Sequence, residues 1–330
     1  MNNLTRPSSL GLTLLGAALF VLVAGCSDAS SVDDDTDVSG DSAVSTDTSS
    51  VDSVDPTDST TSDDTDSADT VGPIGPRFDG PNARFELELA SWGFRLIGAI
   101  PSDDGINFHT ETEREGQCRL LRYAPAFCEP SCTPPAVCVD AACVSPADFL
   151  SAGEITLSGF GAATVTVTPT SFGQYGQDGE SPTATDAGPT VTMSAAGDVV
   201  PAFSIDASPM TAPVPDNEWV AAMEARADGE DVTLTWSDAV PGARIYLRMT
   251  TGIGTHGGIS PVEVECESAD TGALTLPGGY LDALYAGGWS CGECGGNDVW
   301  RYSAGEATVG AFPIEFRVQA RTQFWYHPNF

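Results

Sequence analysis

The chain has 330 residues, of which 41% are hydrophobic, so it is long enough and apolar enough to bury a core. Its 47 acidic residues against 13 basic ones give a formal net charge of -34, and all of the basic residues are arginine. Binding of nucleic acid phosphates requires basic clusters, so this composition excludes nucleic acid as an expected partner.

The N-terminal residues 1–25 are typical of a signal peptide. Arg6 precedes an apolar run from Leu10 to Val23, which is shorter than the roughly 20 residues of a membrane span. The run ends in Val23-Ala24-Gly25-Cys26, which resembles the bacterial lipobox. That resemblance implies a thioether-linked lipid on Cys26, cleavage before it, acylation of the new N-terminus and stable anchoring in a membrane. The alternatives are an uncleaved anchor or a chance cysteine.

The residue after the lipobox cysteine is Ser27, not Asp. In the lipoproteins that the motif resembles, this implies sorting to the outer membrane in two-membrane bacteria. We therefore expect an exported outer membrane lipoprotein that faces either the periplasm or the cell surface.

Residues 26–76 are predicted to form a disordered acidic linker. Positions 27–70 contain 14 Asp, 12 Ser and 8 Thr, with no aromatic and no basic residue. Such a segment buries too little apolar surface to offset its ordering entropy, and its span would be on the order of 40 Å. The stretch starting at Asp35 begins like a calcium-binding EF-hand loop, but its twelfth position is Thr46, where that loop needs a Glu.

Residues 77–330 are predicted to form one mostly β domain, a β-sandwich or jelly-roll-like fold with a small disulfide-rich insert. Short stretches alternate apolar and polar side chains, which is typical of strands with one buried face and one wet face. With 35 Gly and 23 Pro as punctuation, this favours many short strands over a helical bundle. Helices are expected only at Glu218 to Ala227 and Tyr280 to Ala286. The expected strands include Phe85 to Leu89, Ile155 to Ser158, Ala163 to Thr168, Thr190 to Ser194, Val232 to Trp236, Arg244 to Met249, Val262 to Cys266 and Ile314 to Arg321.

Eight cysteines remain once the lipidated one is set aside. An even number in an exported chain predicts disulfides, and the sequence leaves their connectivity open. Five lie between residues 118 and 143, in a Pro-rich stretch too short for a core of its own, so we predict a cross-linked knot there. The arrangement we favour is a crossed pair, with Cys118 reaching elsewhere. The eight are Cys118, Cys128, Cys132, Cys138, Cys143, Cys266, Cys291 and Cys294, and the crossed pair joins Cys128 to Cys138 and Cys132 to Cys143.

The order of these features is similar to that in a group of exported lipoproteins of myxobacterial type. The knot is followed by Ser151-Ala-Gly-Glu-Ile-Thr-Leu-Ser-Gly and later by Cys266-Glu-Ser-Ala-Asp-Thr-Gly. The resemblance runs over most of residues 80 to 280, through loose motifs. It implies a Cys-rich knot beside a β-sandwich region and no activity that can be carried over.

The motif Cys291-Gly-Glu-Cys294 has the spacing of half a zinc site or of a redox pair. A zinc site needs four ligands, and only Cys266 is left to help. A thioredoxin-like reading needs a βαβ context that this region lacks. We therefore favour disulfides, with Cys266 pointing inward and bridging toward the 291–294 loop; a Cys-based metal sensor is the weaker alternative.

Enzymatic signatures are sparse, so no catalytic residue, cofactor or metal is predicted. Gly252 to Gly257 matches a dinucleotide fingerprint, but strand continues after it where a helix is required, so we interpret it as a hairpin loop. The chain has three histidines, His109, His256 and His327. Only His256 lies in an expected loop where it could be catalytic or bind a metal, and we favour the interpretation that it is an exposed turn residue. The 33 acidic residues after the linker leave room for a catalytic carboxylate pair.

Aromatic residues are concentrated late in the chain. We expect most of them to pack in the core, although an exposed patch would suit a sugar ring or a protein partner. They are Trp289, Trp300, Tyr302, Phe324, Trp325 and Tyr326. The function predicted is a membrane-anchored binding or structural module, which we favour over an enzyme, with an extracellular protein or carbohydrate as the ligand class. The alternative is a secreted hydrolase that uses paired carboxylates or a metal.

Overall fold

The computed structural model describes residues 78, 80–103, 108–123, 127–139, 141–250, 260–287 and 297–326. The predictions for the signal peptide, Cys26 and the acidic linker lie outside these residues. Within them the chain is mostly β-strand, which confirms the predicted fold class. No helix in the described ranges is long and apolar enough to cross a bilayer.

The largest sheet has nine strands among the described residues. Neighbouring strands pair antiparallel except for β1 and β18, which run parallel. Its order is β3 (His109–Glu115), β4 (Cys118–Tyr123), β15 (Val262–Ala269), β14 (Arg244–Thr250), β17 (Asn297–Val309), β18 (Phe312–Phe324), β1 (Ala83–Ala90), β2 (Gly93–Ala99) and β9 (Tyr175–Gly179).

Smaller sheets complete the described part of the fold. A four-stranded sheet has the order β11 (Phe203–Ala207), β10 (Val191–Ala195), β7 (Ile155–Phe160) and β8 (Ala163–Val167). A three-stranded sheet has the order β12 (Val214–Pro215), β13 (Val232–Ser237) and β16 (Ala273–Leu276). A hairpin joins β5 (Val137–Val139) to β6 (Ala142–Val144), and a 3-10 turn covers Ala184–Asp186.

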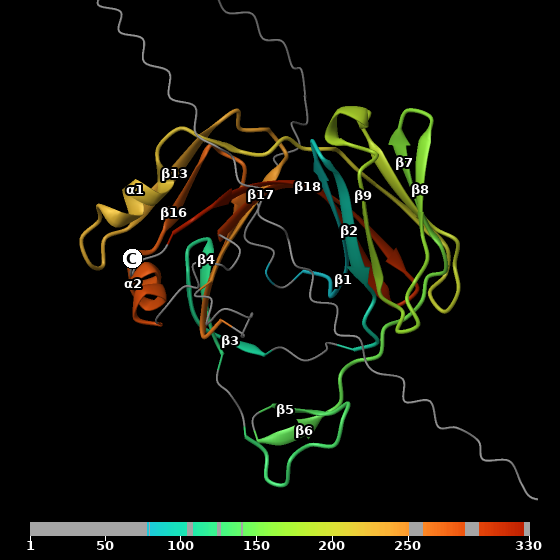
Figure 1. Ribbon diagram of the computed structural model, residues 1–330, viewed down its shortest axis with the longest axis horizontal. Helices are drawn as coiled ribbons and strands as arrows, with labels where there is room; N and C mark the ends of the chain where they lie inside the picture. Colours follow the sequence, from blue (N-terminus) through green and yellow to red (C-terminus); the bar gives the residue numbers. More distant parts are fainter. Residues whose placement is uncertain are drawn as a thin grey trace, which may run out of the picture. The chain divides into compact units, whose positions relative to one another are not determined.

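Two hydrophobic cores lie on the same face of the nine-stranded sheet. One packs β1, β2 and β9 against the four-stranded sheet, and the other packs β4, β14 and β15 against the three-stranded sheet and the two helices. On β18, Phe316 belongs to the first core and Phe324 to the second, and their even spacing puts both on one face. The 13-residue strands β17 and β18 are thus long enough to serve both cores, and Figure 1 shows them running between β7 and β8 at one end and β13 and β16 at the other.

A buried ion pair lies between the two cores. The Arg301 Nε lies 2.7 Å from the Asp270 Oδ2, and both side chains are at most 1% exposed. Asp270 also accepts hydrogen bonds from the Trp236 indole N–H, at 2.7 Å, and from the Val240 backbone N–H, at 2.8 Å. These contacts fix the loops of the three-stranded sheet against β17.

The opposite face of the nine-stranded sheet is less wet than predicted. We expected alternating strands with one solvated side, but β15 is buried from Val262 to Ser268 and β18 from Ile314 to Ala320 on both faces. The polar residues of this face are buried because they pair with each other. Glu265 and Arg119 form one such pair, with the Arg119 Nη2 2.6 Å from a carboxylate oxygen.

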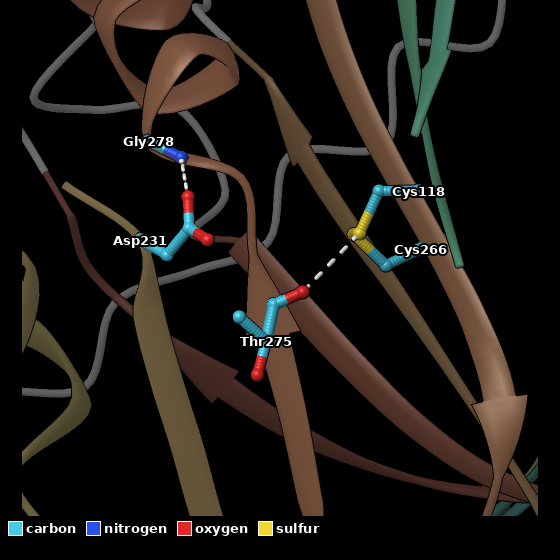
Figure 2. The surroundings of a disulfide bond; sticks show 5 residues. All are labelled: Cys118, Asp231, Cys266, Thr275 and Gly278. Atoms are coloured by element: carbon cyan, nitrogen blue, oxygen red, sulfur yellow. Dashed lines mark hydrogen bonds between the residues drawn. A yellow bond between two sulfur atoms is a disulfide. The ribbon is translucent and has the colours of Figure 1, made fainter. Parts of the chain in front are cut away.

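Both predicted helices are present, with adjusted ends: α1 spans Trp219–Glu224 and α2 spans Gly278–Ala286. α2 begins after Pro277, and its first backbone N–H, on Gly278, donates to the Asp231 carboxylate at 2.8 Å (Figure 2). The carboxylate accepts a hydrogen bond from an N–H that has no partner within the helix. Its negative charge also interacts favourably with the positive end of the helix dipole. The start of α2 is therefore set by a residue on the loop before β13.

The predicted partner of Cys266 was wrong. Cys266 bonds to Cys118, its direct cross-strand neighbour on β4, and not to a cysteine of the 291–294 loop (Figure 2). The prediction looked for a partner near in sequence, whereas the register of β4 and β15 joins residues 148 positions apart. The bond is fully buried in the second core, where the Cys118 sulfur lies 3.6 Å from the carbonyl oxygen of Thr275.

The predicted crossed pair in the knot is confirmed. Cys128 bonds to Cys138 and Cys132 to Cys143, and these two bonds hold the β5–β6 hairpin, which stands apart from the larger sheets in Figure 1. No buried hydrophobic cluster includes this hairpin among the described residues. Cross-links therefore take the place of a core here, as the composition indicated.

Candidate ligand-binding groove

A groove opens on the face of the nine-stranded sheet that faces away from both cores. Its volume is about 390 Å³. Five strands, β1, β2, β14, β17 and β18, contribute its lining, because alternate side chains of neighbouring strands point to the same side. The described residues that line it are Arg84, Glu86, Glu88, Arg95, Ile97, Tyr246, Arg248, Asp298, Trp300, Gln319 and Arg321.

Two aromatic rings form part of the groove wall. Tyr246 and Trp300 are directly opposite on β14 and β17, and their rings stack with centroids 5.4 Å apart and planes inclined by 27°. The Tyr246 hydroxyl donates to Glu265 at 2.7 Å. Burial, together with the negative charge of Glu265, raises the pKa of Tyr246 well above its usual value, so the phenol keeps its proton. The pair is therefore a neutral, fixed aromatic surface.

The four arginines of the groove are all paired with carboxylates. The shortest nitrogen–oxygen distance is 3.2 Å or less for Arg84, Arg248 and Arg321, and it is 3.6 Å between Arg95 and Asp178. The other contacts are Arg84 Nε to Glu315 at 2.8 Å, Arg248 Nη2 to Glu263 at 2.8 Å, Arg321 Nε to Glu88 at 3.2 Å and Arg321 Nη1 to Asp298 at 3.5 Å. The groove thus presents opposite charges side by side, although the chain as a whole is strongly acidic.

The floor beside the groove is a buried polar network around Tyr302. Its hydroxyl donates to Glu267, and Arg244 Nε lies 3.1 Å from both the Tyr302 oxygen and the Glu267 carboxylate. The Arg317 guanidinium lies 4.2 Å from the centroid of the Tyr302 ring. Burial is the main reason that the pKa of Tyr302 is raised. This network joins β14, β15, β17 and β18 next to the lining residues.

The partly buried carboxyl of Asp298 is a weaker acid than that of an ordinary aspartate. Its pKa is raised from 3.8 to about 6, mainly by burial and also by the negative charge of Glu88, although the positive charge of Arg321 opposes the shift. The proton therefore binds more tightly in the folded state than in the unfolded state. This contribution to stability is complete below the unfolded pKa and is lost as the pH rises through about 6.

Replacement of Asp298 by Asn should raise stability at pH 7.5, because the variant avoids ionisation at a site that disfavours it. We expect a gain of about 1–2 kcal/mol, less than the full linkage value because the groove is open to water. At pH 4 the gain should vanish, since the wild-type carboxyl is then protonated in the folded protein. Urea unfolding of both proteins at the two pH values measures this, and an equal difference at both would contradict the raised pKa.

Of the three histidines, His109 alone lies among the described residues, and it does not line this groove. The Nε2 atom of His109, on the edge strand β3, lies 2.9 Å from the Ser260 carbonyl oxygen and 3.4 Å from Glu263. His256 and His327 lie outside the described residues, as does the glycine-rich stretch 252–257. The strands before and after that stretch, β14 and β15, pair antiparallel.

The described cysteines are not available as metal ligands, because all of them are in disulfides. The sulfur atoms of Cys128, Cys132 and Cys143 lie within 4.8 Å of one another, but all three are in disulfides and offer no thiolate. Cys266, the only expected helper for Cys291 and Cys294, is bonded to Cys118. Cys291 and Cys294 themselves lie outside the described residues.

The late aromatic residues have separate places. Phe324 and Tyr326 pack in the second core, which confirms core packing for these two. Tyr302 is buried in the polar network with Glu267 and Arg244, and Trp325 is 47% exposed. Trp300 lines the groove, and Trp289 lies outside the described residues.

Sequence reasoning missed the groove itself, although part of its signal was visible. The alternation on β14 placed Arg244, Tyr246 and Arg248 on the face away from the core. What the alternation could not supply was the order of strands that brings this face beside Asp298 on β17 and Glu88 on β1. Comparison of the chain with protein-family models, curated proteins and solved structures gave no significant match to any of them.

Proposed function

We propose that this chain is a binding module, held at the outer membrane by a lipid on Cys26, and that the groove is its ligand site. The observation that carries the binding function is the groove lining, in which a stacked aromatic pair lies among paired charges. The anchoring rests on the lipobox-like sequence before Cys26.

Ligand sites are concave, combine apolar surface with a few polar groups, and have volumes of roughly 300–1,000 Å³. At about 390 Å³ the groove is within that range. The ion pairs around it, and the Tyr302 network next to them, hold the lining side chains in fixed positions. A site of this kind loses little side-chain entropy on binding.

The proposal is tested by thermal melting against a mixed panel of small molecules: neutral saccharides, dicarboxylates, inorganic phosphate, short peptides and quaternary ammonium compounds. At least one class should raise the melting temperature of the wild type, since a ligand at 100 times its Kd stabilises by about 2.7 kcal/mol. Ile97→Trp, at a groove position that is 43% exposed, should fill the site and abolish the shift.

The matched control is Val199→Trp, which adds the same ring at a position that is 65% exposed and outside the groove lining. It should keep the full response. A panel without any stabilising class, or a shift that persists in Ile97→Trp, would mean that the groove is not a binding site.

A hydrolase is the second candidate, and Asp298 is the observation that favours it. A carboxyl with a pKa of about 6 can donate a proton near neutral pH, and Glu88 contacts the same guanidinium, that of Arg321. Asp298 would act as the general acid and Glu88 as the second carboxylate. Release of reducing ends from an oligosaccharide by the wild type, but not by Asp298→Asn, would favour this candidate over simple binding.

A further inference from the structure

We infer that the ligand of the groove is a neutral saccharide. The inference rests on the proposed function, since it identifies the ligand class of the same groove. Three features of the lining carry it: the balance of its charges, the pairing of its polar groups and its aromatic wall.

Every charged side chain that lines the groove has a partner of opposite charge. Four arginines and three carboxylates line it among the described residues, and each arginine has a carboxylate partner. An anionic ligand would have to compete with those carboxylates, and a cationic one would meet the guanidinium groups. A neutral ligand does neither, so the groove selects against a net charge.

The polar groups offer donors and acceptors in adjacent positions. Arg321 contacts both Glu88 and Asp298, so guanidinium N–H groups and carboxylate oxygens alternate within one cluster. Gln319, from the same strand, adds an amide that can both donate and accept. A sugar hydroxyl is also both a donor and an acceptor, so neighbouring hydroxyls on a ring match this cluster better than groups of a single polarity.

The aromatic wall provides the apolar half of a sugar site. One face of a pyranose ring is dominated by C–H groups, which pack against aromatic faces. Trp300 and Tyr246 provide that surface, and the exposed side chain of Ile97 adds an aliphatic contact. Aromatic rings of this kind combine large contact area with few rotatable bonds.

The test is binding of the full chain to immobilised neutral oligosaccharides built from glucose, mannose, galactose or N-acetylglucosamine, with sulfated and uronic-acid counterparts beside them. The wild type should bind at least one neutral oligosaccharide, and its affinity should change by less than about twofold between 0.1 and 0.5 M NaCl, because no ligand charge is screened. Trp300→Ala should weaken binding about tenfold, since it removes one aromatic contact.

Trp325→Ala is the control, because it removes an exposed tryptophan outside the groove lining and should bind as the wild type does. If Trp300→Ala does not fold, Ile97→Trp takes its place and should abolish binding. Groove-dependent binding of acidic probes alone, weakened by salt, would overturn the saccharide inference and leave the binding function intact. The saccharide inference would also be overturned if neither groove variant alters binding, or if the folded wild type binds no probe. In that case the groove-dependent shift in the melting panel decides whether the binding function stands.

Discussion

Asp270→Asn should destabilise the domain by about 3–5 kcal/mol, the cost of breaking a buried ion pair from one side. The substitution leaves the Arg301 guanidinium, which is fully buried between the two cores, without its carboxylate. It also turns an amide N–H₂ toward either Trp236 or Val240, both of which donate to Asp270 in the wild type. One of these donors then loses its acceptor, which adds to the cost.

Equilibrium unfolding in urea measures the effect. Asp178→Asn is the matched control, because it removes the same charge from an ion pair whose side chains are about half exposed, and such pairs contribute about 0–1 kcal/mol. Equal losses in the two variants would show that burial between the cores does not strengthen the dependence on the pair.

Cys26→Ala should release the protein from membranes completely, since the thiol is the proposed site of lipid attachment. Wild-type protein recovered from the membrane fraction should have the mass of an acylated chain that begins at Cys26. Two or more acyl chains anchor a protein stably, whereas the variant has none. Intact-mass spectrometry with membrane fractionation checks both statements.

Ser27→Ala is the control for this experiment, because it alters the neighbouring residue and keeps the thiol. It should remain acylated and membrane-bound. An unmodified full-length chain in the wild type would refute the anchoring proposal, and an acylated Cys26→Ala variant would place the lipid elsewhere.

Alternation of apolar and polar residues was sufficient to locate most strands. Phe85 to Leu89 and Val232 to Trp236 lie within β1 and β13, because period-two burial is a local property. The same pattern failed to show that Glu265 and Arg317 would be buried. A charged residue can be buried when a partner on a neighbouring strand neutralises it, and that neighbour is set by strand order, which a local pattern does not contain.

The disulfides also divide into those that local sequence predicts and those that depend on strand pairing. In the knot, five cysteines within 26 positions restrict the choices, and the crossed pair was predicted correctly. Cys118 and Cys266 are far apart in sequence, and only the register of β4 against β15 brings them together. The groove depends on still more pairings, and for that reason Trp300, Asp298 and Glu88 could not be assembled into one site from sequence.

The parallel pairing of β1 with β18 constrains when the protein can fold. Arg84, near the start of the domain, bonds to Glu315, 231 residues later. The chain is synthesised from its N-terminus, so β1 is made without its partner and must wait until nearly the whole domain has followed. Such distant contacts slow folding. Because β18 contributes to both cores and to the groove lining, the proposed ligand site can form only after this last strand has been made.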